Sequence, residues 1–286
     1  MSVSCLAIRD EFIDDVVACL ARSFPRRPRN YWVSALERMS LLPVLEGYPR
    51  LGYALLANGR VVGVLLLIFA RCYRADQQYI RCNISSWCVD PEFRASAIVL
   101  HMAAVKHREV TYFNISPAPH TRSLIEAMGF RRISSGQILF FPLPSGFGTG
   151  VRVCLFAPDS AEASLLPAIE RRILADHAAL GCMAILCVAE GNVFPFVFQR
   201  RMLLRNLIAG SQLIYCRNME EFFRFSRSLG RYLLFRSGWF FIVDASGPRP
   251  GLAGRYFPER NPRYFKGPNP PSVGDLAYTE LAVLGP

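Results

Sequence analysis

The dipeptide Asn58-Gly59 constrains the fold more than any other short feature of the sequence. It separates two apolar runs, Tyr53–Ala57 and Val61–Cys72, whose composition favours β-strands. A two-residue turn between such runs requires positive φ at both central positions, and asparagine and glycine adopt this conformation readily. We therefore predict an antiparallel hairpin here, with the remainder of the first half arranged around it.

Hydrophobic periodicity predicts the elements on either side of the hairpin. In chain order they are a strand at Leu6–Ile8, helices at Asp10–Ser23 and Tyr31–Met39, the hairpin, a strand at Tyr79–Val89, a helix at Arg94–His107, a strand at Thr111–Ile115 and a helix at His120–Met128. Ile98, Val99, Met102 and Val105 share one face of the helix predicted at Arg94–His107. Gly129 is expected to end the last helix, because glycine is the usual residue just past a helix C-terminus.

The second half repeats much of this order in a degenerate form. Its predicted elements are a strand at Val151–Phe156, a helix at Ala161–Ala179, a hairpin of Ala184–Ala189 and Val193–Arg200, a strand at Gln212–Cys216, a helix at Met219–Leu229, and strands at Tyr232–Phe235 and Trp239–Val243. The chain is therefore expected to be an α/β protein with two tandem mixed-sheet domains.

A turn-rich segment at the midpoint, Pro142 to Gly150, marks the expected domain boundary. It lacks the Gly-Lys-Ser/Thr ending of a phosphate-binding loop and no helical pattern follows it directly, so we interpret it as a linker. The predicted domains are residues 1–143 and 151–286, the second with a C-terminal extension rich in proline and aromatic residues.

Composition excludes several classes of protein. Hydrophobic residues make up 52% and charged residues 19%, which is far from the composition of a disordered chain. The longest apolar run, Val61 to Ala70, is about half of what a membrane-spanning helix needs, and the acidic N-terminal region does not resemble a secretory signal. Nine scattered cysteines without a C-x-x-C pair favour reduced core thiols over a disulfide framework or zinc site. We therefore expect a cytoplasmic protein with no membrane partner and no metal.

One run of residues resembles a known family. Val89-Asp90-Pro91-Glu92-Phe93-Arg94 closes a predicted strand and opens a helix, and Gly129-Phe130 follows another helix some thirty residues later. These motifs and the order of elements over roughly residues 3–143 resemble the GNAT superfamily of acyl-CoA-dependent N-acyltransferases. The resemblance implies tandem GNAT-like domains, of which the second is degenerate.

The resemblance also implies an activity and a binding site. The predicted strand Tyr79–Val89 would separate from its neighbour at its end. Trp87, Cys88 and Val89 would then align the pantetheine arm of acetyl-CoA or another acyl-CoA. The pyrophosphate would lie at the start of the next helix, held by Arg94 and the backbone of Ala95, Ser96, Ala97, Ile98 and Val99. The amides and dipole of a helix N-terminus favour an anion there. The acyl group would then pass by direct attack to the amine of a small molecule or peptide.

Two departures from the family pattern introduce an alternative. Val99 stands where a smaller residue is usual, and Ile125 stands where the family often has the tyrosine that protonates the departing thiolate. A non-catalytic acyl-CoA-binding module would show both changes. If the domain is catalytic, another acid must serve.

His120 is the candidate for that acid, because it follows a strand end at a helix start and imidazole exchanges protons near neutral pH. A solvated histidine without a role is the alternative. Asn83 and Ser85, with Ser86, could line the acceptor cleft or face solvent, since they alternate along a strand. Cys88 could be a nucleophile, although a cysteine in an apolar strand usually belongs to the core.

Charge and the C-terminal region support a third, disfavoured class. The net charge of +11 suits a negatively charged partner, and Ser246–Asp275 interleaves prolines with basic and aromatic residues, as a nucleic-acid-binding segment can. We expect this segment to be irregular, as a covering loop or a ligand-contacting lid, with a strand near Leu276–Val283.

The second half is not expected to bind acyl-CoA. Glu220 and Glu221 stand at the position equivalent to Arg94 and would repel a pyrophosphate, so acyl-CoA is expected in the first half only.

Overall fold

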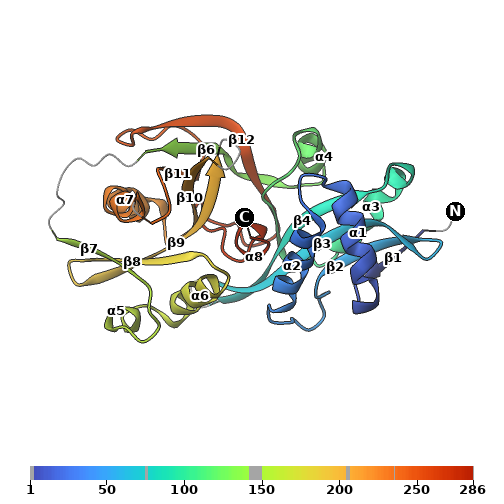
Figure 1. Ribbon diagram of the computed structural model, residues 1–286, viewed down its shortest axis with the longest axis horizontal. Helices are drawn as coiled ribbons and strands as arrows, with labels where there is room; N and C mark the ends of the chain where they lie inside the picture. The colour runs from blue at the N-terminus through green and yellow to red at the C-terminus, as the bar shows by residue number, and fades with distance from the viewer. Residues whose placement is uncertain (1–2, 75–76, 142–149, 204–206, 235, 286) are drawn as a thin grey trace. The chain divides into compact units, whose positions relative to one another are not determined.

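The computed structural model describes residues 3–74, 77–141, 150–203, 207–234 and 236–285 (Figure 1). The chain divides into two compact units. Unit 1 comprises Met1–Arg131, Tyr264–Pro270 and Tyr278–Leu284, and unit 2 comprises Arg132–Arg263, Pro271–Ala277 and Gly285–Pro286. The expected linker, residues 142–149, lies outside the described residues, so the domain boundaries 1–143 and 151–286 stay a prediction.

Unit 1 combines a mixed sheet with several helices. Its elements are β1 (Val3–Ala7), η1 (Asp10–Phe12), α1 (Ile13–Ser23), α2 (Arg29–Ser40), β2 (Gly52–Ala57), β3 (Arg60–Arg74), β4 (Gln77–Val89), η2 (Pro91–Ser96), α3 (Ala97–Ala104), β5 (Thr111–Asn114), η3 (Pro119–Thr121), α4 (Arg122–Ala127) and α8 (Glu280–Val283). The strands lie in the order β1-β2-β3-β4-β5, and the end of β12 (Gly254–Lys266) follows β5. All neighbours are antiparallel except β4 and β5, which run parallel.

The predicted hairpin is confirmed. Ala57 pairs with Arg60, and Asn58 and Gly59 have φ angles of 51° and 75°, the left-handed values that the turn requires. Gly129 is also confirmed at the end of α4, with φ of 88°.

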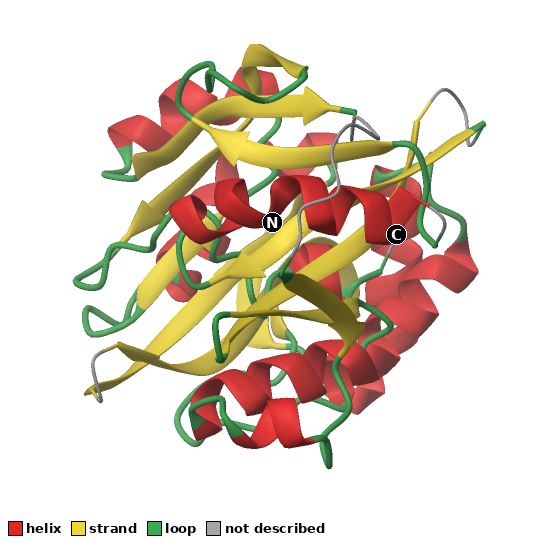
Figure 2. Cartoon of the chain, turned by 90° about the vertical axis from the view of Figure 1, so that its left-hand side faces the viewer, coloured by secondary structure: helices red, strands yellow, loops and turns green. Residues whose placement is uncertain are grey.

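Unit 2 contains the remaining elements. They are β6 (Arg131–Phe140), β7 (Val151–Leu155), α5 (Ala161–Ser164), α6 (Ala168–Ala179), β8 (Met183–Ala189), β9 (Asn192–Leu203), β10 (Ile208–Cys216), α7 (Met219–Leu234) and β11 (Phe240–Ala245). The strands lie in the order β6-β11-β10-β9-β8-β7, with the first part of β12 beside β6. Here the parallel pair is β10 and β11. In each unit, helices pack against the strands. Figure 2 shows the mixture of helices and strands, and the expected mixed-sheet α/β class is confirmed.

Each unit has its own hydrophobic core. In unit 1, aliphatic side chains of β2 and β3, including Leu55, Leu65 and Leu67, pack with Leu100 of α3 and Ile125 of α4. In unit 2, α7 buries phenylalanines against the strands, and their rings contact one another at offset or edge-on angles. None of the helices in the described ranges combines the length and hydrophobicity that crossing a membrane demands.

The helix expected at Arg94–His107 is shorter, and the face predicted to carry Ile98, Val99 and Met102 is exposed. Pro91–Ser96 forms the 3₁₀ helix η2, and α3 begins only at Ala97. Ile98, Val99 and Met102 are exposed, whereas the face toward the sheet carries Leu100, His101 and Ala104. The helix is apolar on nearly every side, so periodicity could not indicate which side faces the core.

Three other sequence predictions are also wrong. The strand expected at Tyr232–Phe235 continues α7, which extends to Leu234. The region Ser246–Asp275 is not irregular throughout, because it contains β12, in which positive φ at Glu259 and Asn261 breaks the extended run beside Pro258 and Pro262. The expected closing strand near Leu276–Val283 contains the helical turn α8 instead.

The two units exchange strands along the chain. Residues 132–140 of β6 belong to unit 2, where Gly136 to Phe140 pair antiparallel with β11. Tyr264–Lys266 of β12 belong to unit 1, where they pair antiparallel with Tyr112 to Asn114 of β5. Each sheet therefore contains a strand from the opposite half of the sequence.

Candidate active site in unit 1

The candidate active site lies where strand β4 separates from strand β5. The parallel pairing of the two strands covers Arg81–Ile84 and Thr111–Asn114 and then stops, while β4 continues along β3 as far as Val89. Ser85 to Val89 therefore have no partner strand in β5. A backbone edge of this kind needs hydrogen-bonding partners.

A β-bulge marks the same position. Cys88 pairs with Val64 and Ser85 with Leu66, so two residues of β4 oppose one residue of β3. Ser86 has φ of 52°, a rare conformation for a residue other than glycine. Bulges re-aim the side chains of a strand. Accordingly, Trp87 stacks on His101 of α3 with ring centroids 5.5 Å apart.

A pocket of about 550 Å³ opens at this end of β4. Among its lining residues are the three strand residues Trp87, Cys88 and Val89, which the sequence predicted as part of the acyl-CoA site. The pocket also brings together three guanidinium groups, of Arg22, Arg60 and Arg94, and two carboxylates, of Asp90 and Glu92. This balance leaves the pocket lining with an excess of positive charge.

Asp90 organises two of these arginines. Arg22 donates to both carboxylate oxygens of Asp90 at 2.9 to 3.2 Å, and Arg60 donates to Oδ2 at 2.9 Å. The Asp90 side chain is 6% exposed, whereas those of Arg22 and Arg60 are 44% and 66% exposed. Burial alone raises the pKa of Asp90, but the hydrogen bonds and charges of the two arginines outweigh it and lower the pKa. An ionised Asp90 thus fixes two cations at the pocket.

His101 contributes an uncharged ring beside the bulge. It is buried between Trp87 and Phe130, and burial, with the charge of Lys266, lowers its pKa to about 4. The ring is therefore neutral at pH 7 and packs as an aromatic group. Neither its burial nor its contact with Trp87 was predicted from the sequence.

Polar side chains gather at the point where the pairing of β4 with β5 stops. Asn83 and Ser85 are 1% and 3% exposed, which excludes the solvent-facing alternative for both. The Ser85 hydroxyl, and that of Ser116 just after β5, donate to the two carboxylate oxygens of Glu280. Asn83 Oδ1 accepts the backbone N–H of Glu280 at 2.6 Å. Within the described part of the chain, no lysine or arginine is paired with Glu280.

Of the other predicted residues, Arg94 lines the pocket, and the rest lie on η2, α3 and η3. His120 is exposed in the 3₁₀ helix η3, four residues after Ser116. Arg94, Ala95 and Ser96 end η2, and Ala97, Ile98 and Val99 begin α3, whose N-terminus has no side-chain cap. Arg22, Arg60 and Glu280 were not predicted, and no local motif distinguishes them from the other charged residues of the chain.

The corresponding strand separation in unit 2 is occupied by the chain itself. Pairing of β10 with β11 ends at Gln212 and Ile242, and β10 has an irregularity between Leu213 and Tyr215. Beyond it, Cys216 N–H donates to Gly274 O at 3.0 Å and Leu276 N–H donates to Ile214 O at 2.8 Å. A single antiparallel bridge joins Tyr215 and Asp275. Residues 274–276 thus satisfy the strand edge that β4 leaves open in unit 1.

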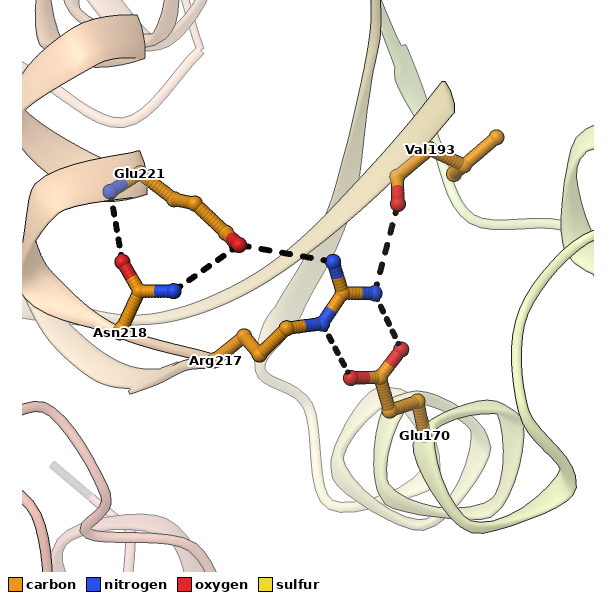
Figure 3. Close-up of polar contacts among 5 residues, drawn as sticks. All are labelled: Glu170, Val193, Arg217, Asn218 and Glu221. Carbon is orange, nitrogen blue, oxygen red and sulfur yellow. Dashed lines mark hydrogen bonds and ion pairs between the residues drawn. The ribbon is translucent and has the colours of Figure 1, made fainter. Parts of the chain in front are cut away.

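The start of α7 is closed by ion pairs (Figure 3). Arg217 Nε and Nη2 donate to the two carboxylate oxygens of Glu170, each at 2.8 Å, and Nη1 lies 3.5 Å from Glu221 Oε1. Asn218 caps the helix, with its Oδ1 accepting the N–H of Glu221 at 2.8 Å. The Arg217 guanidinium and the backbone N–H of Glu221, which an anion would need at this helix start, are thus already bonded to Glu170 and Asn218.

Comparison with known proteins identifies the architecture. No protein-family model and no curated protein sequence matches the chain. Among solved structures, a GCN5-related N-acetyltransferase from Anabaena variabilis matches with a TM-score of 0.59 and 11% identity, covering 93% of this chain and 72% of that one. The chain has the GCN5-related N-acetyltransferase fold.

Two further structures support this GNAT fold over the whole chain. A GCN5-related N-acetyltransferase from Sphaerobacter thermophilus matches with a TM-score of 0.51 and 12% identity, covering 96% of this chain and 98% of that one. A protein from Pyrococcus horikoshii, provisionally described as an acetyltransferase, gives a TM-score of 0.57 and 14% identity, with 99% and 96% coverage. At these identities the likeness is one of fold.

Replacing Asp90 with asparagine should destabilise the protein at neutral pH. The change leaves two neighbouring arginines without their anion, and the expected loss is about 1–3 kcal/mol of unfolding free energy. Because the folded-state pKa of Asp90 is lowered, its stabilisation is present above the unfolded pKa of about 3.9 and disappears as the pH falls through the folded value. Urea unfolding of wild type and Asp90→Asn at pH 7 and in the acid range measures both effects.

Asp14→Asn is the matched control. Asp14 also pairs with an arginine, Arg29, but its side chain is 94% exposed, so its loss should cost less than about 1 kcal/mol. Equal losses from the two substitutions would show that Asp90 does not organise the pocket.

Proposed function

We propose that unit 1 binds an acyl-CoA in the pocket at the end of β4 and transfers its acyl group to an amine. The observation that carries this proposal is the unpaired edge of β4 at Ser85–Val89, which meets a basic pocket of about 550 Å³. The equivalent edge in unit 2 is already bonded to residues 274–276. We therefore assign acyl-CoA binding to unit 1 alone.

The residues present fit the two chemically distinct parts of an acyl-CoA. Arg22, Arg60 and Arg94 suit its phosphates, since guanidinium groups bind phosphate through charge-assisted hydrogen bonds. The backbone of Trp87 to Val89 suits the amides of the pantetheine arm. The uncapped amides at the start of α3 add a second anion-binding element. Val99 is 42% exposed, so its side chain extends toward solvent.

Bound acyl-CoA supplies an activated thioester, and this chain's residues would provide orientation and proton transfer. Ser85 and Ser116 fix the orientation of the Glu280 carboxylate at the closed end of the separation. Since Glu280 has no cationic partner among the described residues, we propose that it binds the ammonium group of the acceptor and takes its proton. We retain His120 as the proposed acid that protonates the leaving thiolate.

One observation favours a second candidate function. Ile125, which replaces the tyrosine expected from the resemblance, is 1% exposed and packs in the core of unit 1. A protein that has lost this acid could bind acyl-CoA without transferring the acyl group. The non-catalytic binding module would keep the pocket and its arginines but show no turnover.

Reversing the charge of Arg94 should weaken acyl-CoA binding. Arg94→Glu is expected to cost about 1–3 kcal/mol of binding free energy, the range for charge-assisted hydrogen bonds. Glu220→Gln, at the equivalent position of unit 2, should leave the affinity nearly unchanged, because Glu220 pairs with Arg249 at the start of α7. Isothermal titration with acetyl-CoA and a longer acyl-CoA measures both. Equal effects would refute the assignment to unit 1.

His120→Ala should lower turnover without changing acyl-CoA affinity. General acid assistance is worth about 10²- to 10⁴-fold, so kcat should fall within that range. His120→Gln keeps a hydrogen-bonding side chain but cannot supply the proton, and it should be similarly impaired. Wild-type turnover in both variants, measured by thiol release from acyl-CoA, would mean that His120 is a surface residue without a catalytic role.

Glu280→Gln should discriminate between acceptors according to charge. An alkylamine is protonated at neutral pH and should lose about 10²-fold or more in kcat/KM, because it needs both charge recognition and proton removal. Aniline, which is uncharged at that pH, should lose far less. Glu259→Gln, a change at an exposed carboxylate of unit 2, serves as the control. Equal losses for both amines would exclude the proposed role of Glu280.

A further inference from the structure

The C-terminal end of α7 meets three strand ends in unit 2. Trp239, just before β11, donates its backbone N–H to Ala209 O near the start of β10 at 2.9 Å. Ala209 in turn pairs with Met202 near the end of β9. The Ser211 hydroxyl of β10 donates to that of Ser237, three residues after α7, at 2.6 Å. The end of α7 and the ends of β9, β10 and β11 (labelled in Figure 1) therefore form one continuous surface.

Three large apolar side chains are exposed on this surface. Leu207 is 82% exposed, Trp239 is 67% exposed and Met202 is 37% exposed. Met202 and Trp239 flank Ala209 on its two sides, and Leu207 lies two residues before Ala209 in the chain. Single exposed apolar residues are common on proteins, but a group of them indicates a surface that binds something.

Arginines accompany these apolar residues. The sequence has no aspartate or glutamate at 191–219 or at 222–243, the two stretches that form this end of unit 2. Arg200 on β9, Arg227 on α7 and Arg236 just after α7 are exposed. Among the described residues, no carboxylate pairs with any of these three. The surface therefore carries positive charge that the chain itself does not neutralise.

The dipole of α7 explains only part of this charge. Cations near a helix C-terminus are stabilising, which accounts for Arg236, whose guanidinium lies 3.9 Å from the centre of the Tyr232 ring. It accounts neither for Arg200 on a strand nor for the exposed Leu207 and Trp239. We call the six exposed residues the apolar–basic patch: Arg200, Met202, Leu207, Arg227, Arg236 and Trp239.

We propose that the apolar–basic patch binds the surface of an anionic lipid bilayer. Arginines are attracted to anionic head groups, and an indole is favoured at the boundary between head groups and acyl chains. Leu207 and Met202 would enter the apolar region beneath. The expectation of no membrane partner concerned spanning segments and secretory signals, and a contact with the bilayer surface needs neither.

The chemistry of the patch favours a bilayer over two other partners. A single-stranded nucleic acid would bind the arginines through its phosphates and stack a base on Trp239, but it offers no apolar environment to Leu207 and Met202. A second copy of the same surface would cover the apolar residues but bring arginines against arginines. An anionic bilayer satisfies the apolar and the basic residues together.

Co-sedimentation of the full-length protein with lipid vesicles tests the proposal. Vesicles of phosphatidylcholine alone are compared with an equal mixture of phosphatidylcholine and phosphatidylglycerol. We expect binding to the mixed vesicles only, and weaker binding at high salt because surface charges are then screened. Leu207→Asp and Arg236→Glu should each lower the affinity about 10-fold or more, through the loss of an inserted side chain and of a surface cation.

Two residues outside the patch provide matched controls. Leu41 of unit 1 is 82% exposed, the same fraction as Leu207, and Arg171 of α6 is exposed. Leu41→Asp and Arg171→Glu introduce the same chemical changes elsewhere and should leave vesicle binding nearly unchanged. Equal losses in patch and control variants would overturn the proposal. So would a wild-type protein that does not sediment with the mixed vesicles, whatever the variants do.

Trp239 reports the contact directly. Of the three tryptophans, Trp32 is 3% exposed and Trp87 is half-buried against His101, so Trp239 is the one that faces water. Its fluorescence should shift to shorter wavelength with the mixed vesicles, because the indole leaves water. Trp239→Phe should still bind the vesicles but lose the shift. Vesicle binding by the wild type without any shift would show that the patch is not the contact surface.

Two further measurements separate the other partners. Binding of single-stranded polyuridine that Arg236→Glu abolishes and Leu207→Asp preserves, without vesicle binding, would overturn the proposal in favour of a nucleic acid. A dimer in gel filtration that Leu207→Asp dissociates, again without vesicle binding, would overturn it in favour of a second copy. This inference goes beyond the proposed function, and the vesicle assays contain no acyl-CoA. Their failure would therefore leave acyl-CoA binding by unit 1 untouched, and failure of acyl-CoA binding would leave the patch untouched.

Discussion

The backbone hydrogen bonds that β4 does not make with β5 determine most of what is distinctive in this protein. Parallel pairing stops at Ile84 and Asn114, while β4 remains bonded to β3 as far as Val89. Buried backbone donors and acceptors rarely remain without partners, so such an edge must be filled by the chain, by water or by a ligand. Unit 2 fills its equivalent edge with residues 274–276, and unit 1 opens its edge onto a pocket. The same strand separation is thus filled by the chain itself in unit 2 and left open to a pocket in unit 1.

The two units also differ in the charges at these strand ends. In unit 1 a single buried carboxylate, Asp90, holds two arginines that keep much of their surface exposed. In unit 2 the arrangement is reversed, because two carboxylates, Glu170 and Glu221, surround Arg217. A bound anion would gain from the first arrangement and be repelled by the second.

Local signals were sufficient for much of the fold, and a family resemblance for part of the site. The Asn58-Gly59 turn and the end of α4 at Gly129 follow from short-range rules on turns and caps. Trp87 to Val89, which line the pocket, were singled out by the resemblance to a known family and not by a local rule. The buried face of α3 could not be predicted, because apolar residues surround the helix and the one informative residue, His101, is polar but buried. The role of Glu280 was also hidden, since Ser85 and Ser116 lie more than 160 positions away in the sequence.

Strand exchange between the units has a consequence for how the chain folds during synthesis. Unit 1 cannot complete its sheet until Tyr264–Lys266 have left the ribosome, although nearly all its other strands are made within the first half of translation. Contacts of such long sequence separation slow folding and leave partly formed sheets with exposed edges. Expressing residues 1–143 alone would therefore yield an incomplete sheet rather than an independent domain. Evolution by truncation to a single unit would first require another strand to replace the end of β12.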